Sequence, residues 1–295
     1  MPDRPRPTAI LGMEPEEADR LLDDLEALVP ARPAFVDVDR AGASEAIVFG
    51  DTHGDWRSTE AVAARFLAAP NDRLLIGLGD YIDRTPGDCP EGSVANALFL
   101  LGLAAEHPGR VYLLRGNHEC ARTVPVLPHD LPEEVDLLWG PDPARYSRLL
   151  GLLERGPLAA RLDAGVYLAH GGFPRRSGDW RAAIAAGNEE AILDITWTDC
   201  ATSRIDRGLG APFTEPELLT FLRACDSRLF LRGHDPDICG RPAYGGRCLT
   251  LHTTRYYERF GGVIFARVPL DRPVRGVGDI VVEHAETQGH RYDTP

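Results

Sequence analysis

Short apolar runs recur through the centre of the chain, and an acid, an amide or a histidine follows each of them within a few positions. The five runs are AIVF (46–49), LLIGLG (74–79), VYLLRG (111–116), VYLA (166–169) and LFLRG (229–233). Apolar runs of four to six residues that are bounded by glycine predict buried β-strands.

Several segments between these runs carry apolar residues at helical spacing. STEAVAARFLAA (58–69) and SVANALFLLGLAAEH (93–107) predict helices. Near the N-terminus, EPEEADRLLDDLEALV (14–29) predicts an amphipathic helix, because a proline and several acids precede the periodic leucines. A chain in which strands and helices alternate in this way is typical of an α/β fold.

The polar residues that follow the five runs form a set with metal-binding chemistry. In α/β folds ligands bind at the carboxyl ends of the strands, so residues that follow different strands are expected to meet. An acidic surface turn would not be repeated at four further strand ends. The six candidate ligands are Asp51, His53, Asp80, Asn117, His170 and His234.

Six oxygen and nitrogen ligands without a thiolate favour manganese, iron or zinc over copper or an iron–sulfur cluster. They are too many for one open catalytic site and about right for two metals that share a bridging carboxylate. Two metals roughly 3.5–4 Å apart can activate a bridging hydroxide and hold the oxygens of an in-line phosphoryl displacement.

Further residues near these positions fit phosphate chemistry. Arg84 and Arg207 carry guanidinium groups that match phosphate oxygens in bidentate geometry. His118 follows Asn117 and is predicted to face the same cleft, where Asp83 could fix its tautomer and keep it protonated as a general acid.

Each of these features has a simpler interpretation when it stands alone. An isolated Asp-x-His is usually a turn or a helix cap, His234 could be a polar turn residue, and Arg207 could form a surface ion pair. All of these features occur together, and each follows a predicted strand, which favours the functional interpretation. Five other histidines are predicted to lie in loops, a strand or the tail and to have no role in the site: His107, His129, His252, His284 and His290.

Composition narrows the class of protein. The chain has 295 residues, and we expect one domain over 1–295 with loose segments at 1–13 and 284–295. It has no apolar run long enough for a bilayer and no signal-peptide core, so we expect a cytoplasmic protein with no membrane partner and with its six cysteines reduced. A formal net charge of −13 disfavours nucleic acid as a partner.

At this point a family resemblance can be stated. GDTHG (50–54), GDYIDR (79–84) and LRGNHECA (114–121) resemble the three-part signature of the phosphoprotein phosphatase family of serine/threonine phosphatases, within the calcineurin-like metallophosphoesterases. HGG, DRG, RGH and TLHTTRYY resemble later motifs of that family in the same order. GNHECA followed by HGG is the more specific signal.

The resemblance implies a central mixed β-sandwich flanked by helices and two metal ions, with manganese expected in vitro and iron or zinc as alternatives. It assigns one metal to Asp51, His53 and Asp80. It assigns the second to Asp80, Asn117, His170 and His234, so that Asp80 bridges. It further implies phosphate binding by Arg84 and Arg207, a pocket lined by Tyr257, and protonation of the leaving group by His118 with support from Asp83.

The sequence departs from the family pattern at Asp55, where Gln or Asn is common, and at Thr85, where Gly is usual after DR. The implied activity is hydrolysis of phosphoserine and phosphothreonine in proteins or peptides. The alternative is hydrolysis of small phosphoesters or dinucleoside polyphosphates, and no feature of the sequence indicates an oligomeric state. Acids near the motifs predict a surround that repels a polyphosphate: Asp55, Asp88, Glu91, Asp199, Asp235 and Asp237.

Overall fold

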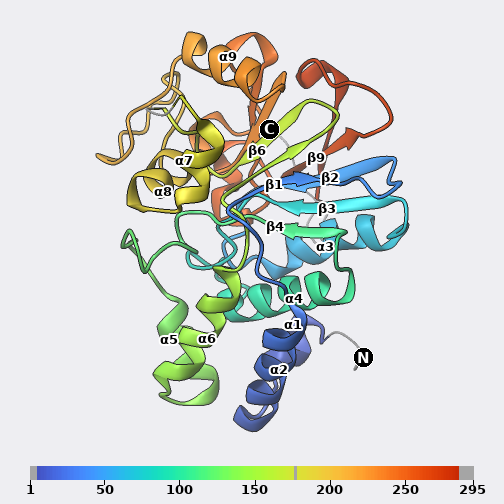
Figure 1. Cartoon of the computed structure of the whole chain (residues 1–295). Helices are drawn as coiled ribbons and strands as arrows, with labels where there is room; N and C mark the ends of the chain where they lie inside the picture. Colours follow the sequence, from blue (N-terminus) through green and yellow to red (C-terminus); the bar gives the residue numbers. More distant parts are fainter. Residues whose placement is uncertain (1–4, 176–177, 286–295) are drawn as a thin grey trace.

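Two five-stranded sheets face each other in the computed structural model, which describes residues 5–175 and 178–285 (Figure 1). The first sheet has the order β10-β9-β2-β3-β4. Strands β2, β3 and β4 are parallel, β9 is antiparallel to β2, and β10 is antiparallel to β9. Its strands are β2 (Glu45–Phe49), β3 (Arg73–Gly77), β4 (Val111–Leu113), β9 (Ile264–Pro269) and β10 (Val281–His284).

The second sheet has the order β1-β5-β6-β7-β8. Strands β6, β7 and β8 are parallel, β5 is antiparallel to β6, and β1 is parallel to β5. Its strands are β1 (Phe35–Val38), β5 (Ala159–Leu162), β6 (Val166–Ala169), β7 (Leu229–Arg232) and β8 (Cys248–Thr250).

Helices cover the outer faces of both sheets (Figure 1). The first group packs on the β2 sheet and comprises α1 (Pro7–Ile10), α2 (Pro15–Leu28), α3 (Trp56–Leu67), α4 (Gly92–Glu106), α5 (Leu131–Trp139) and α6 (Pro143–Leu153). The second group packs on the other sheet and comprises α7 (Trp180–Ala186), α8 (Glu189–Thr196) and α9 (Glu215–Ala224). Short 3₁₀ turns lie at η1 (Pro236–Ile238), η2 (Tyr244–Gly246), η3 (Arg255–Phe260) and η4 (Val277–Asp279).

Each sheet is covered on both sides because its strands are apolar on both faces. In β2, Ala46 and Val48 point between the sheets, whereas Ile47 and Phe49 point toward the helices, and all four are buried. Successive side chains of a strand alternate between its two faces, so a continuous apolar run requires cover on both sides. This arrangement confirms the predicted mixed β-sandwich flanked by helices.

The element predictions are confirmed for all five apolar runs and for the three helices. The prediction of a loose segment over 1–13 is wrong in part: Pro7–Ile10 forms a helical turn, and Ile10 is fully buried in the core that contains α4. Burial of an apolar side chain is favourable and offsets part of the entropy that a short segment loses when it becomes ordered. The prediction of a loose segment over 284–295 is wrong for its first two residues, because His284 ends β10 and Ala285 is buried. Residues 1–4 and 286–295 lie outside the described parts, and the prediction of a single domain stays a prediction.

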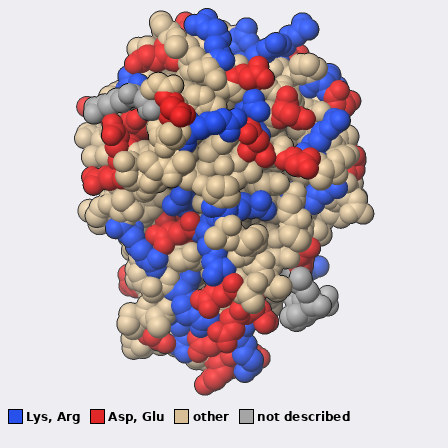
Figure 2. All heavy atoms as spheres, viewed as in Figure 1, with Lys and Arg blue, Asp and Glu red and all other residues tan. Residues whose placement is uncertain are grey.

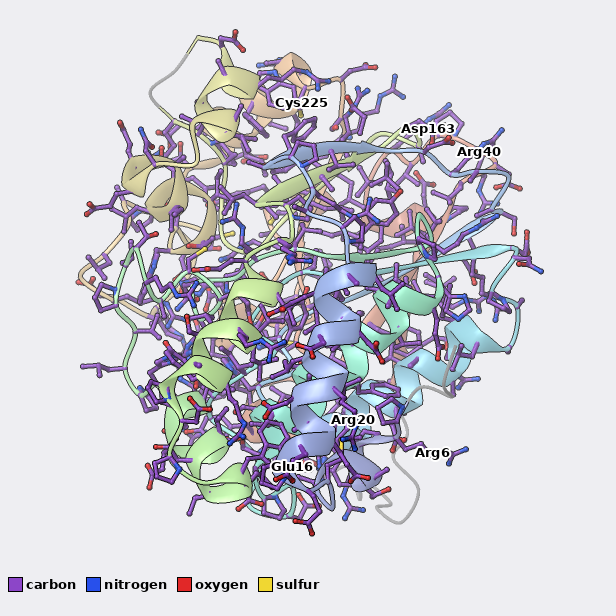
Figure 3. All side chains as sticks on the ribbon, turned by 60° about the horizontal axis from the view of Figure 1, so that its bottom comes forward. Arg6, Glu16, Arg20, Arg40, Asp163 and Cys225 are labelled. Carbon is purple, nitrogen blue, oxygen red and sulfur yellow. The ribbon has the colours of Figure 1, made fainter. Side chains whose placement is uncertain are left out.

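Helix α2 lies beside α6 (Figure 3). Ion pairs join the two helices. Arg145 bonds to Asp19 through two contacts of 2.9 Å, and Arg148 contacts Glu26 at 2.8 Å. Figure 2 shows acidic and basic atoms interleaved over this region. On this face the net negative charge therefore does not form a field of one sign.

The structure also bears on the membrane and redox predictions. No helix within residues 5–175 and 178–285 is both long and apolar enough to cross a bilayer. All six cysteines are free and buried, in agreement with the prediction of reduced thiols.

Candidate metal centre

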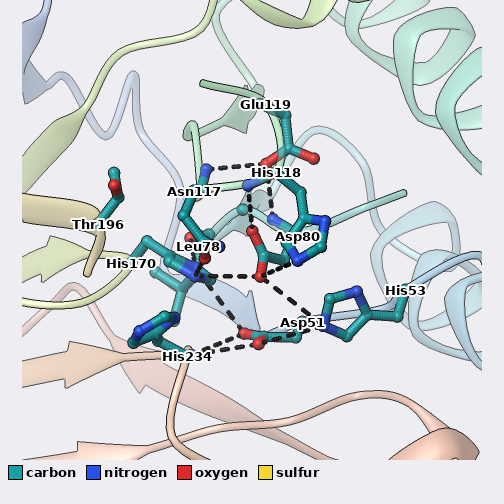
Figure 4. A network of polar contacts seen from close by, with 12 residues as sticks. Asp51, His53, Leu78, Asp80, Asn117, His118, Glu119, His170, Thr196 and His234 are labelled. Carbon is teal, nitrogen blue, oxygen red and sulfur yellow. Dashed lines mark hydrogen bonds and ion pairs between the residues drawn. The ribbon is translucent and has the colours of Figure 1, made fainter. Parts of the chain in front are cut away.

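Loops at the carboxyl ends of the strands bring the predicted ligands together from both sheets (Figure 4). In the first sheet, Asp51 and His53 follow β2, Asp80 follows β3, and Asn117 follows β4. In the second sheet, His170 follows β6 and His234 follows β7. Because β2, β3 and β4 are parallel neighbours, as are β6 and β7, each set leaves its sheet at one edge.

Asp80 lies at the centre of the cluster. Its Oδ2 atom is 3.7 Å from His53 Nε2, 3.3 Å from His170 Nε2 and 3.9 Å from His118 Nε2. Two triads have potential ligand atoms within 4.8 Å of one another: His53, Asp80 and His118, and Asp80, His170 and His234. The position of Asp80 in both triads fits the predicted bridging role.

The remaining predicted ligands border the same cluster. Asp51 places Oδ2 3.8 Å from His53 Nε2 and Oδ1 3.8 Å from His170 Nδ1, and it accepts the backbone N–H of His234 at 3.0 Å. Asn117 places Oδ1 3.0 Å from His170 Nε2. All six candidates thus meet, although His234 and Asp51 are separated by 183 positions in the sequence.

The histidine tautomers fit metal binding. His53 Nδ1 lies 2.9 Å from the carbonyl oxygen of Ile82, and His170 Nδ1 lies 3.0 Å from that of Leu78. A carbonyl only accepts, so Nδ1 carries a hydrogen in both rings, and Nε2 is the nitrogen that would bind a metal ion. His53 Nε2 and His234 Nε2 are buried and have no hydrogen-bond partner, a costly state that a metal ion would relieve.

Burial and mutual charge perturb these groups strongly. Burial raises the pKa of Asp51 to about 6 and lowers the pKa of His53 to about 3. Burial would also lower the pKa of His170, but the charges of Asp80 and Asp51 outweigh it and raise that pKa to about 9. Carboxylates crowded in a dry pocket favour any cation beside them, which is the electrostatic condition for a metal centre.

Several site residues adopt a backbone conformation that side chains disfavour. Five of the nine non-glycine residues with positive φ in the described ranges belong to the predicted site: His53 (44°), Asp80 (57°), Asp83 (65°), Arg84 (53°) and His234 (70°). Such conformations cost about 1–3 kcal/mol each and persist where the surroundings enforce them. They turn the chain sharply after a strand, so that the side chain returns toward the cluster.

The predicted proton donor lies beside the cluster. His118 Nδ1 is 2.6 Å from Asp83 Oδ2, and both side chains are buried. His118 Nε2 is buried and has no partner. His129, which was predicted to have no role in the site, also contacts Asp83, at 2.9 Å through its Nδ1.

The two arginines and the tyrosine lie at the rim of the cluster, and each is partly buried. Arg84 donates to the hydroxyl of Tyr257 at 3.0 Å, and the Tyr257 ring stands edge-on to that of His53 with centroids 5.6 Å apart. Arg207 donates to Asp199 at 3.0 Å and to the carbonyl oxygen of His234 at 2.8 Å. These contacts join the predicted phosphate-binding residues to the predicted ligands.

His252 was predicted to be a strand residue, and it does form an isolated bridge, with Asp51 as its partner. Its ring is fully buried, with Nδ1 3.5 Å from Asp51 Oδ2 and neither nitrogen hydrogen-bonded. Sequence spacing gives no sign of this contact, because it depends on the segment after β8 and the loop after β2 lying side by side.

Asp55 caps helix α3 and forms an ion pair. It accepts the backbone N–H of Ser58 at 3.2 Å at the start of α3 and pairs with Arg255 at 2.7 Å. Thr85, the other departure from the family pattern, is absent from the positive-φ residues and bonds to Glu134 at 3.0 Å. The residue therefore fits without the freedom of glycine.

Five of the six acids that were predicted to repel a polyphosphate lie beside an arginine. These arginines offset part of the negative charge, so the acids repel a polyphosphate less than their residue types indicate. The pairs are Asp55 and Asp88 with Arg255, Asp199 with Arg232 and Arg207, Asp235 with Arg232, and Asp237 with Arg204.

Protein phosphatases of other organisms are similar to this sequence. A probable serine/threonine-protein phosphatase of Encephalitozoon cuniculi is 27% identical over 234 residues, which are 73% of this chain and 48% of the relative. A protein phosphatase 2A catalytic subunit of Dictyostelium discoideum is 27% identical over 202 residues, 65% of this chain and 62% of the relative. The chain thus spans about half to three-fifths of the length of these relatives.

Solved structures share the fold. One is a protein serine/threonine phosphatase from Saccharomyces cerevisiae, described as similar to human phosphatase PP5. It superposes with a TM-score of 0.72 at 18% sequence identity, and the match covers 95% of this chain and 92% of the yeast chain. A cold-active protein-tyrosine phosphatase of a Shewanella species superposes with a TM-score of 0.55 at 17% identity and covers 87% and 84%.

The family model described as calcineurin-like phosphoesterase matches residues 46–237. That range begins in β2 and ends in η1, just past His234, so it includes every predicted ligand. The strand order, the clustered ligands and this match agree, and the chain belongs to the calcineurin-like phosphoesterase family.

Proposed function

We propose that this chain is a metal-dependent phosphomonoester hydrolase that acts on phosphoserine and phosphothreonine in proteins or peptides. Asp51, His53 and Asp80 would hold one metal ion, and Asp80, Asn117, His170 and His234 would hold a second. Manganese is the metal we propose for activity in vitro, with iron or zinc as alternatives. Bound there, the two ions would supply Lewis-acid activation of water and of the phosphoryl oxygens.

One observation carries the proposal: an imidazole–carboxylate pair stands beside the ligand cluster. His118 Nδ1 lies 2.6 Å from Asp83 Oδ2, which leaves Nε2 to face Asp80 at 3.9 Å. Hydrolysis of a serine or threonine phosphoester releases a poor leaving group, and a proton delivered to its oxygen lowers the barrier. We propose that the pair delivers this proton from His118 Nε2.

Two guanidinium groups complete the proposed site. Arg84 and Arg207 would bind the phosphate oxygens, and Tyr257, bonded to Arg84, would line the pocket. Tyr257 holds Arg84, and Asp199 and the carbonyl oxygen of His234 hold Arg207. Side chains oriented in this way would lower the entropic cost of binding the phosphate.

The proposed class of substrate is supported by the names of the relatives. The names of the relatives support phosphoserine and phosphothreonine, whereas the paired acids of the surround no longer argue against a dinucleoside polyphosphate. The alternative function is therefore hydrolysis of small phosphoesters or dinucleoside polyphosphates. A phosphorylated protein as partner and a cytoplasmic location stay predictions.

Parallel assays with added Mn²⁺ would test the proposal. The substrates are phosphoserine, phosphothreonine and phosphotyrosine versions of one peptide, p-nitrophenyl phosphate and diadenosine tetraphosphate, with Asp80→Asn as the background control. We expect the highest kcat/KM on the phosphoserine or phosphothreonine peptide. A preference for the dinucleotide would support the alternative, and a preference for phosphotyrosine would overturn the serine/threonine assignment.

A further inference from the structure

We propose that His129 is a positioning residue for His118, acting through Asp83, and that Tyr146 holds His129 in its orientation. The inference rests on the proposed role of His118 as proton donor and adds two residues to it. His129 lies in the loop before α5, and Tyr146 lies on α6.

The carboxylate of Asp83 is held by four donors. Oδ2 lies 2.6 Å from His118 Nδ1 and 2.9 Å from His129 Nδ1. Oδ1 accepts the backbone N–H groups of Asp130 at 2.7 Å and Leu131 at 3.0 Å, at the start of α5. The two imidazoles thus share one oxygen, and the helix terminus takes the other.

This pattern fixes where the protons lie. An ionised carboxylate only accepts, so Nδ1 carries the hydrogen in both rings. His129 Nε2 lies 3.0 Å from the Tyr146 hydroxyl, within hydrogen-bond distance. Tyr146 therefore contacts His129, His129 donates to Asp83, and Asp83 also accepts the hydrogen bond from His118.

The arrangement sets the orientation of the proposed acid. Burial would raise the pKa of Asp83, but the hydrogen bonds from His118 and His129 outweigh it and hold that pKa well below its usual range. Without His129, Oδ2 would keep only the bond from His118, and the carboxylate plane could rotate about the bonds to Oδ1. The His118 ring would then lose its fixed direction, which matters because small misplacements of a reacting group are costly.

A merely structural role for His129 makes different predictions. If the residue only anchors the loop before α5, its loss would affect all substrates equally or alter metal content. If it positions His118, the loss falls on kcat, leaves KM and metal content unchanged, and grows as the leaving group becomes more basic.

The variants separate these cases. His129→Phe keeps a ring and removes the donor, whereas His129→Asn keeps an N–H group at the place of Nδ1. Tyr146→Phe removes one hydroxyl. Leu127→Ala is the loop control, since Leu127 is 87% exposed in the same loop.

We would measure kcat and KM on phenyl phosphate and p-nitrophenyl phosphate, together with bound manganese. We expect His129→Phe to lower kcat on phenyl phosphate roughly 10–100-fold, the range usual for partners that orient a functional histidine, and to affect p-nitrophenyl phosphate less. His129→Asn should recover most of the loss, and Leu127→Ala should match the wild type. Equal losses on both substrates would overturn the proposal. If His129→Phe does not fold, Tyr146→Phe must show a smaller loss with the same dependence on the leaving group.

A second readout needs no turnover. The His118 Nδ1 proton in the short bond to Asp83 should give a far-downfield resonance, assigned by its disappearance in His118→Asn. His129→Phe should shift that resonance, and Leu127→Ala should not. An unshifted resonance would refute the positioning role even if the enzyme acts as proposed, whereas a shift in a protein that hydrolyses none of the substrates would refute only the proposed function.

Discussion

At the scale of single residues, Asp80 and His118 are the two side chains on which the proposed site depends most. Asp80 contacts three imidazoles, whereas His118 contacts Asp80 and Asp83. Both residues are fully buried, so each is tested by an asparagine substitution that keeps a polar side chain and removes the charge or the proton donor. Their proposed roles differ, and two substitutions separate them.

Asp80→Asn should reduce metal content and hydrolysis together. The substitution removes the negative charge that faces His53, His170 and His118 but preserves the shape of the side chain. Metal analysis of the purified variant, beside phosphatase assays, checks this expectation. Two full equivalents of metal with wild-type turnover would show that Asp80 does not bridge.

His118→Asn should retain the metals and lose roughly 10²–10⁴ in rate, the usual scale of general acid catalysis. The loss should be larger for a phosphoserine peptide than for p-nitrophenyl phosphate, because p-nitrophenolate leaves with little protonation. Steady-state kinetics on both substrates decide the matter. Equal losses would contradict an acid role and favour His118 as a ligand, consistent with its place in the first triad.

At the scale of elements, buried side chains from one helix satisfy the end of another. Helix α4 begins after Glu91, which gives no side-chain cap. Glu134 of α5 fills that role, since it accepts the backbone N–H of Ser93 at 2.8 Å and of Val94 at 3.3 Å. It also bonds to Thr85, next to Arg84, so this contact links the helix pair to the rim of the site.

Glu134→Ala should lower the free energy of unfolding by about 1–3 kcal/mol, because it leaves buried N–H groups without an acceptor. Urea denaturation followed by circular dichroism measures the change. Glu133→Ala is the matched control, since Glu133 is exposed on the same helix turn. Similar midpoints for the two variants would mean that water replaces the carboxylate.

At the scale of the whole molecule, the cluster lies where the two sheets meet. Asp51, Asp80 and Asn117 follow strands of one sheet, and His170 and His234 follow strands of the other. The core between the sheets is apolar, and the crowded carboxylates oppose their closure at this edge. A bound cation would join the sheets and remove that opposition.

Manganese should therefore raise the midpoint of thermal unfolding, and a chelator should lower it. A ligand present at 100 times its Kd stabilises the folded state by about 2.7 kcal/mol. For a chain of this size that corresponds to a rise of several degrees, at roughly 2–4 °C per kcal/mol. Thermal melts with manganese and with chelator test this, and the shift should shrink in Asp80→Asn. Identical melts under both conditions would argue against a metal that links the sheets.

The sequence by itself determined five of the ten strands that the described residues form, three of the helices and the set of candidate ligands. Each of the five runs carries its own signal, because a strand buried on both faces must be continuously apolar. The candidate ligands could be predicted because each follows such a run closely, as Asp51 follows β2 and His170 follows β6. Information of this kind is local and needs no knowledge of what packs nearby.

Only the tertiary structure decided which distant side chains meet. His129 reaches Asp83 across 46 positions, Arg255 neutralises Asp55 across 200, and Ile10 finds the core that contains α4. Loop residues have no periodic pattern, so their partners cannot be derived from spacing. Their contacts arise from the packing of helices on the two sheets, which brings the loop before α5 against the turn after β3 and places a second histidine on Asp83.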